Sequence, residues 1–357
     1  MAKLRHFLDI DVLTAAKQRI HHIFDLYDSV VVCFSGGKDS TVVLELAREV
    51  AAERGIEKIE ALFRDEELIP NQVVDFVDSY RQKPWLNLIW FTVPLESHKF
   101  YMGKVIGYVQ WDPNREHVRP KPAWGVSLPL GDNRVMSQYS MDEYAASFYP
   151  GKVAFLTGIR AEESLIRYRA SVNKLNDSYI NASASKRVSL CKPIYDWREN
   201  DVFRYFYERE IRYCPWYDQQ MWAGDSLRVT TPLCSEPAKQ YHRSMPVDPE
   251  FYDRIMRVFP EMRTQARYWK EFDRESVYEK YGSDGYRGIF NYIDLEIEEE
   301  VQKVKAREFV NMCQRRTEIG NSGEYEIRDV LKHVVNGQFR RTYIGGHTNQ
   351  FNEKASV

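Results

Sequence analysis

The feature that most constrains this chain is a short polar loop between an apolar run and a helical pattern. Residues 30–34 (VVVCF) are apolar, mostly β-branched and too few for a helix, which predicts a buried strand of a parallel sheet. Apolar residues then recur at helical spacing from residue 41 to residue 54, and a glycine follows at 55. The sequence SGGKDS lies between the two, at residues 35–40. Glycines at the start of a helix let the backbone approach an anion, which the helix dipole also favours.

The loop is therefore a candidate phosphate site, formed by Ser35, Gly36, Gly37, Lys38, Asp39 and Ser40. We expect Lys38 to neutralise phosphate charge and to act in catalysis with Asp39, which would also hold a magnesium ion directly or through water. The loop is not a Walker A motif, because Val32 stands where that motif has its first glycine. The alternative is a tight strand-to-helix turn without a ligand, which would not need all four residue types together.

The string SGGKDS resembles the PP-loop of N-type ATP pyrophosphatases residue for residue. Members of that family cleave ATP between its α and β phosphates and commonly transfer AMP. The resemblance implies ATP and Mg²⁺ as ligands, and a HUP-like, adenine nucleotide alpha hydrolase-like fold.

The order of strand and helix patterns predicts the fold class. Further strands are predicted at residues 59–63, 86–93 and 153–157, and helices at residues 1–28 and 70–81. Asp11 is the predicted N-cap of the first helix. Strands that alternate with helices indicate an α/β protein with a doubly wound, mostly parallel sheet, whose ligands bind at the carboxyl ends of the strands.

Asp65 follows the second predicted strand directly. The stretch resembles the second-strand motif of phosphoadenosine phosphosulfate reductases, where an aspartate ends the strand before a Thr-Gly pair. Glu66 and Glu67 replace that pair here, so the resemblance implies a nucleotide contact for Asp65 alone. Capping of the next helix by Asp65 is the alternative.

The segment 95–140 contains four prolines and four glycines, which predicts an irregular connection. A connection of this length usually serves as a lid or a binding loop. Residues 141–148 are predicted to be helical.

A second motif, GIRAEESLIR, begins at residue 158, at the end of a predicted strand. Its polar residues lie at positions i, i+3, i+4 and i+7, which predicts one helical face beside the phosphate site. The guanidinium fork suits phosphate or sulfate, and a glutamate could orient an arginine. The alternative is a salt-bridged, solvated helix. The residues of this face are Arg160, Glu163, Ser164 and Arg167, and Gly158 opens the motif.

This motif resembles the G-[IL]-R-x-x-E-S-x-x-R signature of the same reductase family and of the small subunit of bacterial sulfate adenylyltransferase. The resemblance implies that Arg160 and Arg167 act in catalysis and that Gly158, Glu163 and Ser164 help to bind the nucleotide. Residues 193–205 resemble that family's P-I-x-x-W-x-x-x-D-V-x-x-Y segment, in which we assign only capping and packing roles.

Composition excludes some classes of protein. The formal net charge of −2 gives no general reason to expect nucleic acid or an acidic membrane as partner. The five cysteines form no C-x-x-C pair, which argues against a disulfide framework or a zinc site. The sequence predicts no signal peptide and no membrane-spanning segment, so we expect a cytoplasmic protein.

The resemblance ends near residue 235, which predicts a PP-loop domain over residues 1–235 and a mainly helical extension over residues 236–357. Basic residues collect at the end of this extension, where a nucleic-acid contact is one hypothesis and a solvated tail is the alternative. These residues are Arg328, Lys332, His333, Arg340, Arg341 and His347.

Three functions remain open on these grounds. The first is an enzyme that binds ATP with magnesium and adenylates an anionic or nucleic-acid-linked acceptor. The second is a sulfonucleotide reductase or sulfur-transfer enzyme, although the reductases' Glu-Cys-Gly-Leu-His motif is absent from the sequence. The third is a nucleotide-sensing regulator with a protein partner, similar to the immunoglobulin-binding regulators of this superfamily, which carry a C-terminal extension.

Overall fold

The computed structural model describes residues 8–102, 104–164, 167–168, 171, 179–183, 185, 187–224, 227–234, 237–238, 241–268, 275–318 and 326–337. The chain divides into two compact units, of which the larger spans Leu8–Asp273 and the smaller holds the described residues from 275 onward.

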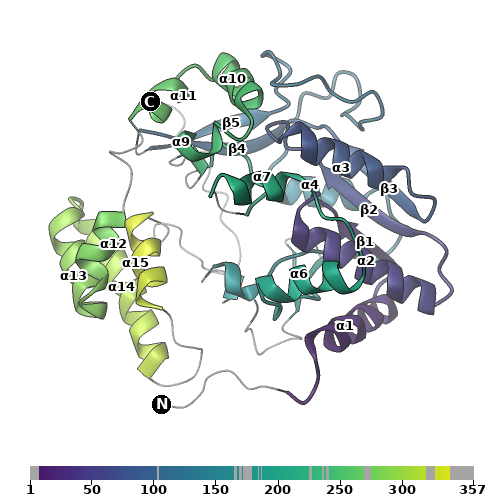
Figure 1. The fold of residues 1–357 in the computed structure, drawn as a ribbon, viewed down its shortest axis with the longest axis horizontal. Helices are drawn as coiled ribbons and strands as arrows, with labels where there is room; N and C mark the ends of the chain where they lie inside the picture. The colour runs from purple at the N-terminus through teal and green to yellow at the C-terminus, as the bar shows by residue number, and fades with distance from the viewer. Residues whose placement is uncertain are drawn as a thin grey trace. The chain divides into compact units, whose positions relative to one another are not determined.

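The larger unit is built on a six-stranded sheet with the order β3-β2-β1-β6-β8-β7. Figure 1 labels β3, β2 and β1 side by side at one edge of this order. Neighbouring strands are parallel except for β7, which runs antiparallel to β8. The predicted doubly wound, mostly parallel sheet is thereby confirmed. The strands are β1 (Ser29–Cys33), β2 (Ile59–Arg64), β3 (Leu86–Phe91), β6 (Val153–Leu156), β7 (Ile180–Ala182) and β8 (Val188–Cys191).

Helices cover both faces of the sheet, and adjacent residues of β1 show how. Val32 packs into a cluster with residues of α1 (Val12–Leu26), α2 (Lys38–Glu53), α3 (Asn71–Arg81) and α6 (Glu199–Glu208). Val31 points to the other face, where α4 (Gln138–Ala146) supplies Met141. The all-apolar run of β1 is explained by this double burial.

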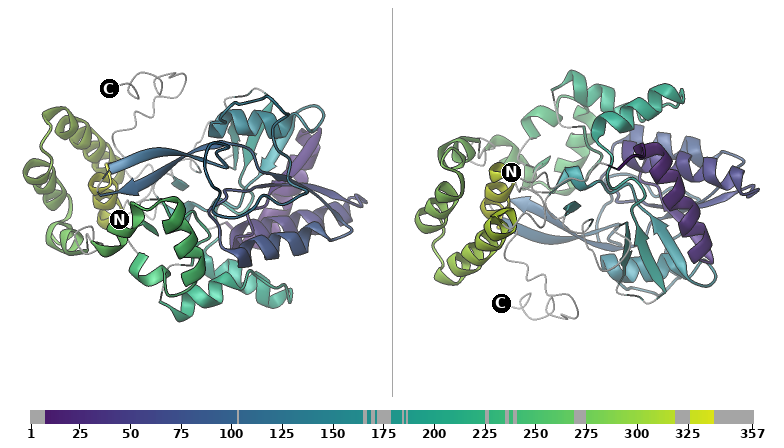
Figure 2. Two further views of the ribbon diagram at one scale, coloured as in Figure 1. Left: turned by 90° about the horizontal axis from the view of Figure 1, so that it is seen from above. Right: turned by 90° about the horizontal axis from the view of Figure 1, so that it is seen from below.

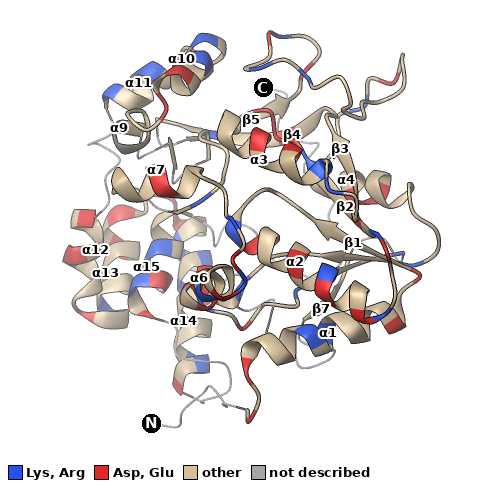
Figure 3. Ribbon diagram, turned by 45° about the vertical axis from the view of Figure 1, so that its right-hand side comes forward, with Lys and Arg blue, Asp and Glu red and all other residues tan. Residues whose placement is uncertain are grey.

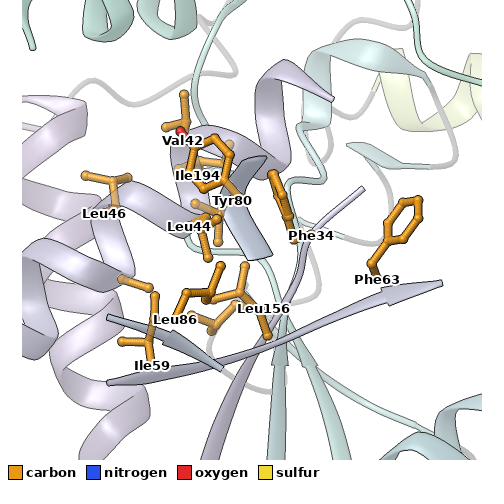
Figure 4. Packing of buried hydrophobic residues seen from close by; sticks show 14 of the residues in the cluster. Phe34, Val42, Leu44, Leu46, Ile59, Phe63, Tyr80, Leu86, Leu156 and Ile194 are labelled. Atoms are coloured by element: carbon orange, nitrogen blue, oxygen red, sulfur yellow. The ribbon is translucent and has the colours of Figure 1, made fainter. Parts of the chain in front are cut away.

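The first face holds the larger core (Figure 4). Leu44 and Leu46 of α2 are fully buried there against the strand residues Ile59, Leu86 and Leu156. Burial of each such side chain contributes about 1.5–3 kcal/mol, so α2 and the loop before it are held firmly against the sheet. At the start of α1, the Asp11 carboxylate accepts from the N–H groups of Leu13 and Thr14, both at 2.9 Å, which confirms its predicted N-cap role.

The prediction of an irregular segment over residues 95–140 is wrong for its first part. Strands β4 (Leu95–Tyr101) and β5 (Lys104–Gln110) form an antiparallel hairpin, which projects from the central sheet in both views of Figure 2. Gly107, which suggested a break, lies inside β5, where a side chain would meet only open space. A glycine on a strand face open to solvent interrupts no packing, and this explains the error.

Beyond the sheet, the larger unit contains α7 (Trp216–Trp222), α9 (Tyr241–Ser244), α10 (Pro249–Val258) and α11 (Met262–Arg267). Phe251 and Ile255 of α10 and Met262 of α11 pack in one buried cluster with Phe100 of the hairpin. Helices α9 to α11 therefore belong to the larger unit, and the predicted boundary at residue 235 stays a prediction.

The smaller unit consists of α12 (Glu275–Gly282), α13 (Gly285–Glu296), α14 (Glu300–Glu318) and α15 (Ile327–Val335), as expected for a helical extension. Its helices carry basic and acidic residues side by side (Figure 3). None of the described helices of the chain has the length and apolar character needed to cross a membrane. The buried residues of this unit include Ile289, Ile293, Val310, Val330, Leu331 and Val334.

Candidate functional site

The string at residues 35–40, which we call the loop, follows β1 as predicted, and its last three residues form the first turn of α2. Gly37 is the N-cap of α2 and Lys38 is its first residue. Gly36 has a φ of +73°, and a Cβ there would lie 2.7 Å from Cγ2 of Val77. Both the backbone conformation and the lack of space thus require glycine at residue 36.

The two serines of the loop bond to each other and to the loop backbone. The Ser40 hydroxyl donates to the Gly37 carbonyl at 2.9 Å and accepts from the Ser35 N–H at 3.1 Å. The two hydroxyl oxygens lie 3.0 Å apart. The serines therefore hold the loop in shape, and their predicted contact with a ligand stays a prediction.

The loop lies where the order of the strands reverses. From β1 the chain continues to β2 and β3 on one side, and later strands β6 and β8 lie on the other. Ligands of open α/β sheets bind at such a point, beyond the carboxyl ends of the strands. The N–H groups of Asp39 and Ser40, in the first turn of α2, donate to no group within the described residues.

The second motif contacts the first. A Cβ at Gly158 would lie 2.6 Å from the carbonyl carbon of Asp39 and 2.7 Å from the nitrogen of Ser40. Only glycine lets the end of β6 approach the start of α2 this closely. Two motifs roughly 120 residues apart in the sequence thus lie against each other in the fold.

Three charged side chains form what we term the loop cluster: Lys38, Asp39 and Arg160. The Arg160 Nε donates to Oδ1 of Asp39 at 2.6 Å, and its NH1 lies 3.3 Å from Oε2 of Glu162. Lys38 and Arg160 are each only 4% exposed, so their charges lie in a region where electrostatic interactions are strong. The predicted proximity of loop and arginine is present in the structure.

The amine and amide of Lys38 both bond to a later segment of the chain. Its ammonium donates to the Leu227 carbonyl at 2.8 Å and lies 3.2 Å from Oε1 of Glu199. Its backbone N–H donates to the Tyr217 hydroxyl at 2.8 Å. Sequence reasoning missed all three partners, because they lie more than 150 residues away and none stands at a fixed position of a motif.

The prediction of a single helical face from Arg160 to Arg167 is wrong. A short 3₁₀ turn covers Ala161–Glu163, and Ser164 is extended with φ −166° and ψ 158°. The Ser164 hydroxyl accepts from the Arg167 N–H at 3.3 Å, so it caps a new helical turn. Serine is a strong N-cap residue, and here it ends one turn and starts the next.

Glu163 nevertheless connects the two arginines. Its carboxylate accepts from the Arg160 N–H at 3.3 Å and forms an ion pair with the Arg167 guanidinium. Burial lowers the pKa of Arg167, and the neighbouring charges of Arg228 and Arg160 lower it further. The charge of Asp39 acts in the opposite direction, and an anion bound beside Arg167 would do the same.

Asp65 belongs to a second group of charges, which we term the strand-end cluster: Asp65, Glu67, Arg115 and Arg119. The Asp65 carboxylate is fully buried and accepts from the Trp90 indole at 2.8 Å, from the Glu67 N–H at 2.8 Å and from Arg119. Its geometry is that of a structural group, and the nucleotide contact predicted for it stays a prediction.

Glu67 completes the strand-end cluster and is also fully buried. Each of its carboxylate oxygens accepts from Arg115, at 2.7 and 2.6 Å. The backbone N–H groups of Trp111 and Val118 donate to it as well, at 2.6 and 2.9 Å. The cluster therefore fixes the segment after the hairpin to the end of β2.

The cysteines are free thiols within the described residues. Burial raises the pKa of Cys33, Cys191 and Cys214 to about 12 and that of Cys234 to about 11. These four thiols therefore stay protonated at neutral pH and are poor nucleophiles.

Two of the basic residues predicted to contact nucleic acid have partners within the smaller unit. Arg328 forms an ion pair with Glu275, and the His333 ring stacks on Phe309 at a centroid distance of 4.6 Å. Arg340, Arg341 and His347 lie outside the described residues.

Comparison with protein-family models shows the family of this chain. Residues 29–256 match the model of the phosphoadenosine phosphosulfate reductase domain, and this range includes the loop, the second motif and the Tyr217 segment. The chain belongs to this family. The resemblance inferred from the two motifs is thereby confirmed, and the match extends beyond residue 235 into α10.

Two relatives of this reductase-domain protein are described as uncharacterized proteins. One is YbdN of Escherichia coli strain K12, 29% identical over 237 residues, which are 62% of this chain and 58% of that protein. The other, from Methanocaldococcus jannaschii, is 27% identical over 190 residues, which are 52% of this chain and 38% of that protein. The chain thus matches little more than half of one relative and less of the other.

Similar solved structures include three enzymes. The FMN adenylyltransferase of Candida glabrata with FMN and the ATP analogue AMPCPP matches at TM-score 0.41 and 14% identity, over 64% of this chain and 67% of that one. The phosphoadenylyl-sulfate reductase of Candida auris matches at 0.35 and 14%, over 60% and 88%. The U34-tRNA thiolase of Methanococcus maripaludis matches at 0.33 and 16%, over 73% and 78%.

Proposed function

We propose that this protein binds ATP at the loop of residues 35–40 and cleaves it between the α and β phosphates, transferring AMP to an anionic acceptor. The observation that carries the proposal is the geometry of the loop: N–H groups at the start of α2 combine with the loop cluster at the point where the strand order reverses. Polyphosphates bind where backbone N–H groups, a lysine and the positive end of a helix dipole converge.

Arg160 and Arg167 are the groups that we assign to the acceptor. In the proposed step an acceptor oxygen forms a bond to the α-phosphorus, and the bond from that phosphorus to the oxygen bridging to the β-phosphate breaks. Pyrophosphate leaves with the electron pair, so no redox partner is needed. An acceptor that is already an anion requires no general base, and catalysis then rests on positioning and charge neutralisation.

Asp39 is the residue that fits a magnesium ion. Its Oδ1 is paired with Arg160, while its Oδ2 lies 3.8 Å from the Lys38 ammonium, beyond hydrogen-bond distance. No group of three or more His, Cys, Asp or Glu side chains placed to hold a metal occurs among the residues that the structure describes. A magnesium ion at Asp39 would be bound through one carboxylate, phosphate oxygens and water, and it would neutralise phosphate charge.

A sulfonucleotide reductase is the second candidate, because the family takes its description from that activity. Its chemistry needs a nucleophilic thiolate, whereas burial raises the pKa of Cys33, Cys191, Cys214 and Cys234. The intact Lys38–Asp39 pair also suits a triphosphate. We therefore favour adenylation.

The test is to incubate the protein with magnesium and with ATP labelled at the α or the γ phosphate. Candidate acceptors, including sulfate and nucleic acid, are added in separate reactions. We expect the α label in AMP or an adenylated acceptor and the γ label in pyrophosphate. Release of the γ label as inorganic phosphate, with ADP as the other product, would contradict the proposal. A labelled sulfonucleotide converted to sulfite with thioredoxin would instead support the reductase.

A further inference from the structure

Tyr217 lies over the phosphate loop although no motif includes it. The side chain is 3% exposed, and burial raises the pKa of its hydroxyl well above the usual range. The hydroxyl oxygen accepts a hydrogen bond from the Lys38 N–H at 2.8 Å. That N–H is the first of α2, one of the groups that a phosphate oxygen would use.

The Tyr217 hydroxyl and a phosphate oxygen compete for the same place. A Cβ at Gly37 would lie 3.2 Å from the Tyr217 hydroxyl oxygen, so this oxygen lies against the loop where it has no side chain. An N–H group has one hydrogen and makes one strong bond, so Lys38 cannot serve both oxygens at full strength. A charged phosphate oxygen forms the stronger bond of the two.

A second contact covers the loop from the same part of the chain. The Lys38 ammonium, which we assign to phosphate, donates to the Leu227 carbonyl at 2.8 Å. Cβ of Val229 lies 3.8 Å from the position that a Cβ on Gly37 would take. The amide and the ammonium of Lys38 are thus both held by residues from 217 to 229.

These covering residues are tied together. Gln220 of α7 donates from Nε2 to the Arg228 carbonyl at 2.8 Å and accepts at Oε1 from the Arg228 N–H at 3.1 Å. The Gln220 side chain is buried, so these bonds are strong and well ordered. Displacement of Tyr217 would therefore move the residues around Arg228 together with α7.

We propose that Tyr217 gates the phosphate loop: a polyphosphate displaces its hydroxyl from the Lys38 N–H, and α7 moves with it. The inference rests on the proposed function, because it assigns the loop to the phosphates of a nucleotide. Ligand binding at the loop would thereby change the surface formed by α7 and the residues around Arg228.

The first measurement compares the binding of inorganic pyrophosphate and of ATP with magnesium by wild type and Tyr217→Phe. Loss of the hydroxyl frees the Lys38 N–H, so we expect the variant to bind both ligands about three- to tenfold more tightly. Tyr213→Phe is the matched control, because its hydroxyl donates to Asp218 at 2.8 Å on the same segment and does not contact the loop. The control should bind as wild type does.

The second measurement needs no ligand. Amide hydrogen exchange at Lys38 should be about two- to tenfold faster in Tyr217→Phe than in wild type, with the exchange of β1 unchanged as a check on the fold. Equal exchange rates of the Lys38 amide in Tyr217→Phe and wild type would contradict the proposal that Tyr217 gates the loop.

The outcomes separate this inference from the proposed function. Tighter pyrophosphate binding by Tyr217→Phe, in a protein that does not cleave ATP between α and β, supports the gate and contradicts the function. ATP cleavage by wild type with equal or weaker ligand binding by Tyr217→Phe overturns the gate alone. Failure of both proteins to bind either ligand overturns both.

Discussion

The loop cluster and the strand-end cluster both lie at the carboxyl edge of the sheet, but they differ in how far protein groups satisfy their charges. In the strand-end cluster each carboxylate oxygen of Asp65 and Glu67 has a donor from the protein. In the loop cluster Asp39 keeps an oxygen with only a distant partner, and two adjacent N–H groups of α2 have none within the described residues.

We take this difference to separate a structural cluster from the proposed binding site. A buried charge network that is completely paired holds segments together and gains nothing from a ligand. A network with unused donors at a helix N-terminus gains free energy when an anion arrives. Substitutions in the strand-end cluster should therefore affect folding, and those in the loop cluster should affect binding and turnover.

The largest effect is expected for Glu67→Gln. The substitution places an amide donor against the Arg115 guanidinium or the donating N–H groups and removes the charge that Arg115 pairs with. Breaking a buried pair in this way should lower the free energy of unfolding by about 3–5 kcal/mol, measured by chemical denaturation.

Glu208→Gln is the control for this prediction. Glu208 pairs with Arg204 on the exposed face of α6, and such a surface pair contributes less than about 1 kcal/mol. If Glu67→Gln were no more destabilising than Glu208→Gln, the strand-end cluster would not be the structural element described above.

Next in size is the effect of replacing Arg160 or Arg167 by lysine. Lysine keeps the positive charge but loses the paired N–H donors, so pyrophosphate release from ATP should fall about 10- to 100-fold. Circular dichroism and thermal unfolding should show the fold unchanged. Two lysine variants with the turnover of wild type would make these arginines salt-bridge partners and nothing more.

The smallest effects are expected for cysteine substitutions. Cys191, Cys214, Cys234 and Cys313 should each become serine without loss of pyrophosphate release. Cys33→Ser buries a hydroxyl in β1 and should lower the free energy of unfolding by about 1–3 kcal/mol. Strict dependence on thioredoxin, together with loss of activity in Cys313→Ser, would restore the reductase.

The sequence predicted those parts of the fold whose signal is local. The apolar run of β1, the glycines of the loop and the helical spacing of α2 all lie within some 25 residues, and the structure has them as expected. The same holds for β6 and Gly158. The two motifs could be joined in space because parallel strands bring their carboxyl ends to one edge.

Sequence reasoning missed features for two reasons: some depend on contacts between distant residues, and others have a weak or ambiguous local signal. Tyr217 and Leu227 reach Lys38 across 179 and 189 positions, and no local pattern marks them. Strands β4 and β5 were missed because many of their residues are only half-buried, which weakens the alternation that predicts a strand. The helical spacing from Arg160 to Arg167 fits either one continuous helix or two turns separated at Ser164. The spacing alone does not distinguish these two structures, and the second is the one observed.

The most direct test of the account is a calorimetric titration of ATP and magnesium into wild type, Lys38→Ala and Asp39→Ala, with Glu67→Gln measured on its folded fraction. We predict that Lys38→Ala and Asp39→Ala each weaken binding by about 1.5–3 kcal/mol, because a charge-assisted contact is lost. Glu67→Gln should bind within about twofold of wild type. Unchanged affinity in both loop variants would contradict the assignment of the loop cluster to the nucleotide.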